Sequence, residues 1–495
     1  MDVTPASHPR SISLSNLASA LVTRFQWKGQ LSDIDEAVEI HREALTLTPV
    51  SRPDRSMSLG NLAEALTTRY EKNSQLADLE DAIECRREAL GLSPSPHPNR
   101  SRQLTSLANA LVRRLKQKGH FFDLEEAITL YREALNLIPT SHPDCSNTLT
   151  NLAIALAERF ERKDQLSDLE EAMDTFQRAS VSESSPLLTR FRSSRTWARF
   201  ADRYNHSSTQ DAFQHAISFL LQLASLDVIL QERYEILVQN RGLASQAFSW
   251  AVRSERMETA VEFFSAAQAV FWLQTLSLRT PLDELEAAEP LLGKKLRAIS
   301  SELEHVSHWS LAPNADMRKV DKEAIRRRRL AEQWNSTLAE VRGRPSFEDF
   351  LLLKPFTKLR QAVSNGPVVL LNADASGCDG LVIYQDHVKH FPIQSLTFEE
   401  VTELGQITRA ALESKGIRFD WTKFDVPIEA DSDTIKTVAE QTSADSESYR
   451  KGHRIPDSGQ TPEDRFRHVL SRLWYTVAWS IIDALNMKVM MLQVT

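Results

Sequence analysis

The sequence has few of the residues that mark sites of covalent or metal chemistry. Its three cysteines, at positions 85, 145 and 378, lack the paired spacing of a disulfide framework or a zinc site. Only 14 glycines are present, and none belongs to a phosphate-binding glycine loop. We therefore expect no metal site, no cofactor and a reducing, cytoplasmic environment.

Long apolar runs and a strong excess of one charge are also missing. The formal net charge is -8, which offers no basic surface for nucleic acid or an anionic membrane. The most apolar stretch, residues 261–278, is interrupted by Glu262, Gln268 and Gln274, so it predicts a buried helix and not a membrane span. Hydrophobic residues make up 41% of the chain, enough for a sizeable core.

What the sequence does contain is a repeat of about 45 residues. Four similar strings, SNLASAL, GNLAEAL, TSLANAL and TNLAIAL, begin at Ser15, Gly60, Thr105 and Thr150. A second set of strings, of the type DLEEAITLYREAL, begins at Asp33, Asp78, Asp123 and Asp168. Similarity at a fixed period of this size is typical of a solenoid.

Each repeat is predicted to hold two helices. Apolar residues with helical spacing form one stripe in the first helix, at Leu14, Leu17, Ala18, Leu21 and Phe25. We expect N-caps at the serines before the first helices (Ser11, Ser56, Ser101 and Ser146) and at the four aspartates that open the second strings. One repeat cannot bury its own apolar face, so neighbouring repeats must stack.

The pattern L-x-N-L-A-x-A-L…D-L-E-x-A-I-x-x-x-R-E-A-L resembles the tetratricopeptide repeat family, in a long-loop variant of its 34-residue unit. The variant is similar to repeats found upstream of CHAT domains, which are caspase-like. The segments METAVEFFSAAQAVFWLQTLSLRTPLDEL, FEDFLLLKPF and GPVVLLNA also resemble the approach to a CHAT domain and its first strand.

The predicted fold class is mostly α: a tetratricopeptide-like α-solenoid followed by a small, incomplete α/β region of caspase-like type. We assign residues 1–180 to the repeats, 181–345 to irregular helical repeats and connecting helices, and 346–495 to a partial CHAT domain. A disordered insertion is predicted near 434–462. The convincing strand signals are Val368–Leu371, Leu381–Tyr384 and Val388–Phe391.

The resemblance implies a catalytic histidine and cysteine after a helix similar to Val469–Leu485. No histidine follows His468 and no cysteine follows Cys378, so we predict no catalytic residue and no enzymatic activity in this chain. A pairing of Cys378 with His387 or His390 is the alternative, although a small packing role for the cysteine is favoured. Residues 5–9 match the inter-repeat loop that begins at Pro49, which suggests a fragment that opens inside an array.

The polar side of the first helices is the candidate binding surface. The resemblance implies that first helices line a concave groove, where an asparagine can hydrogen-bond an extended peptide backbone. The peptide-binding candidates are Asn16, Asn61, Asn109, Asn151, Thr23, Thr68 and Arg113. The alternative is that they are polar residues on an exposed face. Arg24, Arg69, Arg114 and Arg159 also recur, and a role in bridging repeats is favoured over contact with an acidic ligand.

The sequence is compatible with three functions. The favoured one is a protein–protein interaction scaffold that binds a peptide or protein partner, with an inactive CHAT region. The alternative is a caspase-like cysteine peptidase regulated by its repeats and active only in a full-length form. A nucleotide-binding signalling protein is disfavoured, because no G-x-x-x-x-G-K-[ST] string is present. Neither the partner nor the oligomeric state follows from the sequence.

Overall fold

A computed structural model describes residues 7–52, 54–94, 99–139, 142, 144–182, 184–225, 240, 242–275, 281–309, 317–414 and 461–485. The chain forms two compact units, which are described separately. The first holds residues 1–208 and 306–331, and the second holds residues 209–305 and 332–495. The predicted insertion at 434–462 lies outside the described residues except for its last two positions.

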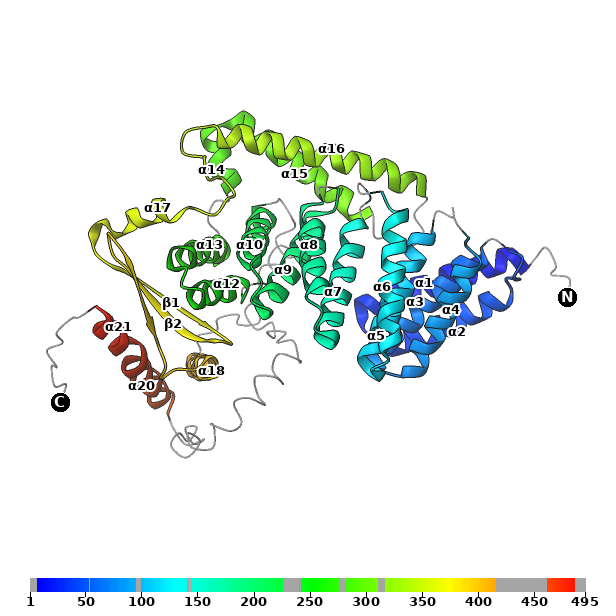
Figure 1. Cartoon of the computed structure of the whole chain (residues 1–495), viewed down its shortest axis with the longest axis horizontal. Coiled ribbons are helices and arrows are strands. Elements are labelled where there is room, and N and C mark those ends of the chain that lie inside the picture. The colour runs from blue at the N-terminus through cyan, green and yellow to red at the C-terminus, as the bar shows by residue number, and fades with distance from the viewer. Residues whose placement is uncertain are drawn as a thin grey trace. The chain divides into compact units, whose positions relative to one another are not determined.

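The first unit contains four helix pairs in the predicted step of 45 residues (Figure 1). The first helices of the pairs are α1 (Ser7–Lys28), α3 (Arg55–Asn73), α5 (Arg100–Lys118) and α7 (Cys145–Lys163). The second helices are α2 (Leu31–Thr46), α4 (Leu76–Gly91), α6 (Phe121–Leu137) and α8 (Leu166–Val181). A further helix, α9 (Leu187–Arg203), packs against α7 and α8. The predicted two-helix repeat is confirmed.

The core of the array consists of the residues that recur in every unit. Ala18, Ala63, Ala108 and Ala153 are fully buried, as expected where helices cross closely. Leu62, Leu107 and Leu152 are also buried, whereas the equivalent Leu17 is 50% exposed. Leu17 was predicted to face inward, and that prediction was wrong. In later repeats this leucine packs against the preceding helix pair, as Leu62 does in a cluster with Phe25 and Ile34, and no described pair precedes α1.

The predicted serine and aspartate caps were wrong. The N-cap positions of α2, α4, α6 and α8 are held by Gln30, Gln75, His120 and Gln165, and no side chain caps these helices. Ser56 and Ser146 lie inside their helices and bond neighbouring elements: Ser56 Oγ meets Ser93 Oγ at 2.9 Å, and Ser146 Oγ donates to the Ala179 carbonyl at 2.7 Å. They connect helices instead of starting them.

The first helices end by backbone geometry that also repeats. Gly29, Ser74, Gly119 and Asp164, each 45 residues apart, have φ between 54° and 70°. Their amides donate to the carbonyls of Phe25, Tyr70, Leu115 and Phe160, which closes the last helical turn. Glycine adopts this left-handed conformation freely, whereas Ser74 and Asp164 carry a conformational cost.

The second unit begins with helices and then contains a small sheet. Its helical part comprises α10 (Thr209–Ser225), α12 (Gly242–Arg253), α13 (Met257–Thr275) and α14 (Pro281–Ala288). The residues of the long helices α15 (Pro290–Trp309) and α16 (Met317–Arg342) are divided between the two units, at 305/306 and at 331/332. The short α17 (Phe356–Leu359) and the 3-10 helix η1 (Arg360–Asn365) lead to the strands. None of the helices in the described part of the chain is long and apolar enough to cross a membrane.

The sheet is an antiparallel meander in the order β1-β2-β3. Its strands are β1 (Val368–Asp374), β2 (Gly377–Ile383) and β3 (Val388–Pro392), close to the three predicted runs. Gly380 lies opposite Phe391, and a Cβ atom at Gly380 would stand 2.0 Å from the ring. The glycine therefore leaves the space that this aromatic side chain fills. An antiparallel meander by itself does not define a caspase-like sheet.

Helices cover both faces of this sheet (Figure 1). On one face, Asn372 Nδ2 donates to Ser249 Oγ at 2.9 Å and to the Ser245 carbonyl at 3.2 Å, which attaches β1 to α12. On the other face, Val382 and Phe391 form a core with side chains from α18 (Phe398–Ser414) and from the C-terminal helices. Those helices are α20 (Pro462–Leu473), the π-helical turn η3 (Trp474–Ala478) and α21 (Trp479–Ala484).

Candidate peptide-binding surface

The recurring arginines of the first helices are structural. Arg24, Arg69, Arg114 and Arg159 each donate two hydrogen bonds of 2.6–2.9 Å to an aspartate nine residues later, at the start of the second helix. Three of them also reach a carboxylate of the preceding repeat: Arg69 to Asp35, Arg114 to Glu80 and Arg159 to Glu125. These bonds raise the pKa of all four guanidinium groups. Arg69, Arg114 and Arg159 therefore bridge adjacent repeats, the role favoured from the sequence, whereas Arg24 joins the two helices of its own repeat.

We define the first-helix face as one row of four residues from each first helix, together with Asn16, Asn61 and Asn151, which lie four residues after the first member of their rows. Members of a row follow the spacing i, i+3, i+7 and i+11, which places them on one side of a helix. The rows are Ile12, Ser15, Ser19 and Thr23; Met57, Gly60, Glu64 and Thr68; Arg102, Thr105, Asn109 and Arg113; and Asn147, Thr150, Ile154 and Glu158. All of these residues except the buried Thr68 are at least partly exposed.

Two of the candidate asparagines meet across adjacent repeats. Asn151 Nδ2 donates to Asn109 Oδ1 at 3.0 Å, and the Tyr131 hydroxyl donates to the same oxygen at 2.6 Å. Asn109 and Asn151 are half-buried, and Tyr131 is 2% exposed. The network fixes the Asn109 amide plane, so its NH₂ group has a defined direction.

The other candidates have mixed environments. Thr23 and Thr68 donate to backbone carbonyls four residues earlier in their own helices, Ser19 and Glu64. Arg113 forms an ion pair with Glu71 of the preceding repeat. Asn16 is exposed and Asn61 is half-buried, and neither makes a side-chain hydrogen bond within the described part of the chain. These two asparagines are the candidates best placed to bond a ligand.

A second-helix position beneath the first-helix face changes in every repeat. It is occupied by His41, Arg86, Tyr131 and Phe176, all at least 91% buried. Arg86 Nη2 contacts Glu64 Oε2 at 3.3 Å and Thr67 Oγ1 at 3.2 Å, 22 and 19 residues earlier in the chain. Tyr131 meets Asn109 at the same 22-residue separation. In the second and third repeats, the residue at this position therefore bonds the third member of the row.

His41 and Arg86 carry buried polar atoms that are not satisfied. His41 Nδ1 and Arg86 Nε lack a hydrogen-bond partner among the described residues. Burial lowers the pKa of His41 to about 4 and also lowers the pKa of Arg86. Desolvation disfavours the charged form of each side chain, so His41 is neutral at pH 7.

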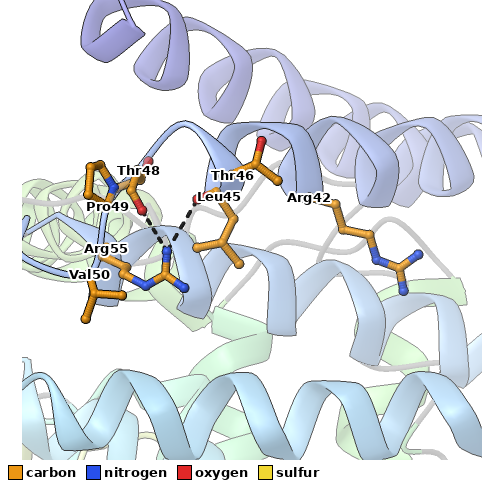
Figure 2. A pocket seen from close by; sticks show the side chains of 7 residues that line it. All are labelled: Arg42, Leu45, Thr46, Thr48, Pro49, Val50 and Arg55. Atoms are coloured by element: carbon orange, nitrogen blue, oxygen red, sulfur yellow. Dashed lines mark hydrogen bonds between the residues drawn. The ribbon is translucent and has the colours of Figure 1, made fainter. Parts of the chain in front are cut away.

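A hollow at the junction of α2 and α3 is lined by both helices and by the loop between them. Figure 2 shows the Arg55 guanidinium pointing to the Thr48 and Leu45 carbonyls, with Arg42 directed elsewhere. The Arg55 Nη1 distances are 2.6 Å to Thr48 and 3.4 Å to Leu45. Arg100 repeats the contact with the Ser93 carbonyl at 3.0 Å. The first arginine of α3 and of α5 therefore holds the preceding inter-repeat loop in the same way.

Cys378 lies in the core of the sheet region. The side chain is 6% exposed, and burial together with Asp379, Asp374 and Glu400 raises the pKa of its thiol to about 11. His390 Nε2 lies 2.7 Å from Asp379, and His387 stacks on Tyr384. A nucleophilic cysteine needs a lowered pKa. The packing role favoured from the sequence fits this environment.

Two features of the surface were missed from the sequence. The strict period was predicted to end near residue 180, with irregular repeats after it, but continuing the step of 45 from Asn147 reaches Arg192 in α9. The matched pairs 22 residues apart were also missed. In one repeat the pair is Arg86 with Glu64, and in the next it is Tyr131 with Asn109. Such pairs can be recognised only once the packing of the two helices is known.

These stacked helix pairs, with an invariant core and a varied exposed row, define a helical-repeat protein of the α-solenoid class. Residues 56–99, one full unit from α3 to the loop before α5, match the family model for the tetratricopeptide repeat. The chain therefore contains tetratricopeptide repeats, as the resemblance implied.

Comparisons over longer stretches gave remote similarities. No curated protein matches the chain. A crystal structure of a putative kinesin light chain with nearly identical TPR-like repeats from Podosopora anserina is 18% identical, covers 43% of this chain and 96% of its own, and has a TM-score of 0.33. The crystal structure of BtubC (BKLC) from P. vanneervenii is 15% identical, covers 49% of this chain and 90% of its own, and has a TM-score of 0.33.

Proposed function

We propose that this chain is a protein-interaction scaffold whose first-helix face binds an extended segment of a partner protein. The observation that carries the proposal is the contrast between constant and varied positions. The crossing alanines and the arginine–aspartate pairs are the same in all four repeats. The third position of each row changes from Ser19 to Glu64, Asn109 and Ile154. Constant positions maintain the stack, and varied exposed positions suit recognition of one sequence.

The asparagines supply the chemistry for backbone recognition. An amide side chain offers both a donor and an acceptor, which matches the alternating groups of an extended peptide. Asn16 and Asn61 have unused hydrogen-bonding groups, and the network with Tyr131 orients Asn109. We propose these residues and Asn151 as peptide contacts, with Thr23, Thr68 and Arg113 at the edge of the same surface.

A random peptide library selected on the full chain tests this function. Selected peptides are resynthesised with a fluorescent label, and binding is measured by anisotropy. Asn61→Ala is expected to weaken binding about five- to thirtyfold, the value of one or two hydrogen bonds of about 1 kcal/mol each. Asn136→Ala, a change of the same residue type at an exposed position of α6, is the control and should leave binding unchanged. Equal effects of the two variants would count against the proposed face.

We further propose that residues 346–495 form a CHAT-like region without peptidase activity in this chain. The support is the sequence resemblance together with the buried, protonated thiol of Cys378. An epoxide probe for cysteine peptidases is expected to leave the folded chain unlabelled at pH 7, because the thiolate is the nucleophile. Labelling that disappears in Cys378→Ser and in His390→Gln would instead support the peptidase alternative.

A further inference from the structure

The side-chain amide of Asn109 has one saturated end and one unused end. Its Oδ1 atom accepts two hydrogen bonds, from the Tyr131 hydroxyl at 2.6 Å and from Asn151 Nδ2 at 3.0 Å. An amide oxygen has two lone pairs, so this atom has no capacity left to accept. The NH₂ group of Asn109 makes no hydrogen bond in the described part of the chain and is not enclosed, so it reaches solvent with its donors unused.

The buried hydroxyl of Tyr131 determines how the amide is oriented. Tyr131 lies in the core, and burial raises the pKa of its hydroxyl, so the group keeps its proton. Asn109 Oδ1 is the acceptor for that proton, and the hydroxyl has no other partner among the described residues. If the amide were rotated by half a turn, its nitrogen would face the hydroxyl and the buried proton would have no acceptor. Such a buried, unpaired donor is unfavourable, so the amide is held in one orientation.

Asn151 presents the opposite kind of group beside Asn109. One hydrogen of Asn151 Nδ2 is used by Asn109, whereas Asn151 Oδ1 makes no hydrogen bond within the described residues and reaches solvent. The two side chains belong to the neighbouring first helices α5 and α7, and both are half-buried. A free donor and a free acceptor are therefore adjacent on the first-helix face. Carbonyl and N–H groups alternate along each edge of an extended chain, so this pair complements one of each.

This arrangement is found in the third of the four repeats. The positions equivalent to Tyr131 in the other repeats are His41, Arg86 and Phe176. Among these, Arg86 bonds the third member of its row, the carboxylate of Glu64, which can only accept hydrogen bonds. The third members of two neighbouring rows thus differ in polarity, because Glu64 offers an acceptor and Asn109 offers a donor.

We infer that Tyr131 and Asn151 hold Asn109 as a hydrogen-bond donor only, and that Asn109 binds a backbone carbonyl of the partner segment. This inference rests on the proposed function and specifies the polarity of one contact. Asn109 is the contact residue, and Tyr131 is a positioning residue that does not touch the segment. Asn61 is not restricted in this way, because its amide has no partner within the described residues and keeps both a donor and an acceptor.

Changing Asn109 to aspartate distinguishes a donor from an acceptor. Aspartate has the same shape and still accepts from Tyr131 and Asn151, but an oxygen replaces the NH₂ group and repels a carbonyl. With a library-selected peptide and the full chain, anisotropy should show binding weakened about fivefold by Asn109→Ala, the value of one hydrogen bond, and at least about three times further by Asn109→Asp. If Asn109 acted as an acceptor, Asn109→Asp would bind more tightly than Asn109→Ala.

Two controls exclude a general effect of the added charge. Asn136→Asp introduces the same charge at an exposed position of α6 and should change binding less than about twofold, as expected of a screened, distant charge. The measurements are repeated in about 1 M salt, where the Debye length is about 3 Å, and the order of the two Asn109 variants should persist. A reversed order in high salt would overturn the inference.

Tyr131→Phe tests the positioning role. Without the hydroxyl the Asn109 amide is free to rotate, so binding should weaken about threefold in the parent chain and hardly change in Asn109→Ala, since the hydroxyl acts through Asn109. Tyr70→Phe is the matched control, because Tyr70 is also buried and its hydroxyl has no partner within the described residues. It should leave binding unchanged. Equal weakening by Tyr131→Phe in both backgrounds would show a merely structural role and overturn the inference.

The outcomes separate this inference from the proposed function. If Asn61→Ala weakens binding but Asn109→Asp binds as well as the parent or better than Asn109→Ala, the donor role is wrong and the scaffold function stands. Circular dichroism checks that each variant folds, and if Asn109→Asp does not, the comparison of Tyr131→Phe in the two backgrounds decides alone. If no library-selected peptide binds the full chain, the proposed function itself is wrong.

Discussion

Replacing Asp78 with alanine is expected to lower the free energy of unfolding of the repeat array by about 2–4 kcal/mol. The Asp78 carboxylate is 4% exposed and accepts two hydrogen bonds from Arg69, at 2.6 and 2.9 Å. Its removal leaves a guanidinium group that is 15% exposed with only the 3.3 Å contact to Asp35. The cost lies below that of a fully buried pair, because Arg69 keeps some contact with water. Urea denaturation followed by circular dichroism measures the change.

Asp81→Ala is the matched control for this prediction. Asp81 lies one turn further along the same helix and pairs with Arg42 at 3.0 Å, but both side chains are more than 40% exposed. An exposed pair contributes about 0–1 kcal/mol. Similar losses for the two variants would mean that the arginine–aspartate pair does not join the two helices of the repeat as described.

Acidification from pH 7 to pH 5 is expected to destabilise the first repeat by about 2 kcal/mol through His41 alone. The folded-state pKa of His41 is about 4, below its ordinary value of 6.5, because the side chain is 2% exposed. Between these two values the unfolded chain binds more protons than the folded one. The contribution is therefore present above pH 6.5 and is lost as the pH falls toward 4. Urea denaturation at both pH values provides the measurement.

His41→Phe isolates this contribution, because phenylalanine already occupies the equivalent position 176. The variant should lose about 2 kcal/mol less than the parent between pH 7 and pH 5. His120→Gln changes an exposed histidine and should leave the pH dependence as it was. An unchanged pH dependence in His41→Phe would contradict the assignment of a buried, neutral imidazole.

The sequence predicted the repeat well because the period fixes both helices and their buried alanines. The prediction that Asp33 and its equivalents are N-caps was wrong. It was made because an aspartate in a polar turn before a helix is typical of an N-cap. In every unit an arginine stands nine residues before this aspartate. The joint recurrence of the two residues was the sequence feature that could have predicted their ion pair. Leu17 was predicted to face inward from its helical spacing in the apolar stripe, but burial of such a residue depends on a neighbouring helix pair that its own repeat cannot reveal.

The candidate site was predicted less completely than the fold. Helical spacing placed Asn16, Asn61 and Asn151 on one side of their helices, but spacing within a helix carries no information on contacts between helices. The bond from Asn151 to Asn109, and the Tyr131 hydroxyl beneath it, depend on how two repeats stack. The packing of α9 against α7 and α8 escaped notice because the sequence similarity fades before the stacking does.

The central claim is that the first helices, and not the second, contact the partner segment. A photo-crosslinking amino acid placed at position 109 on α5, or at the exposed position 136 on α6, tests it directly with a library-selected peptide. The account predicts a crosslinked product for position 109 that unlabelled peptide competes away, and none for position 136. Crosslinking at position 136 with none at position 109 would contradict it.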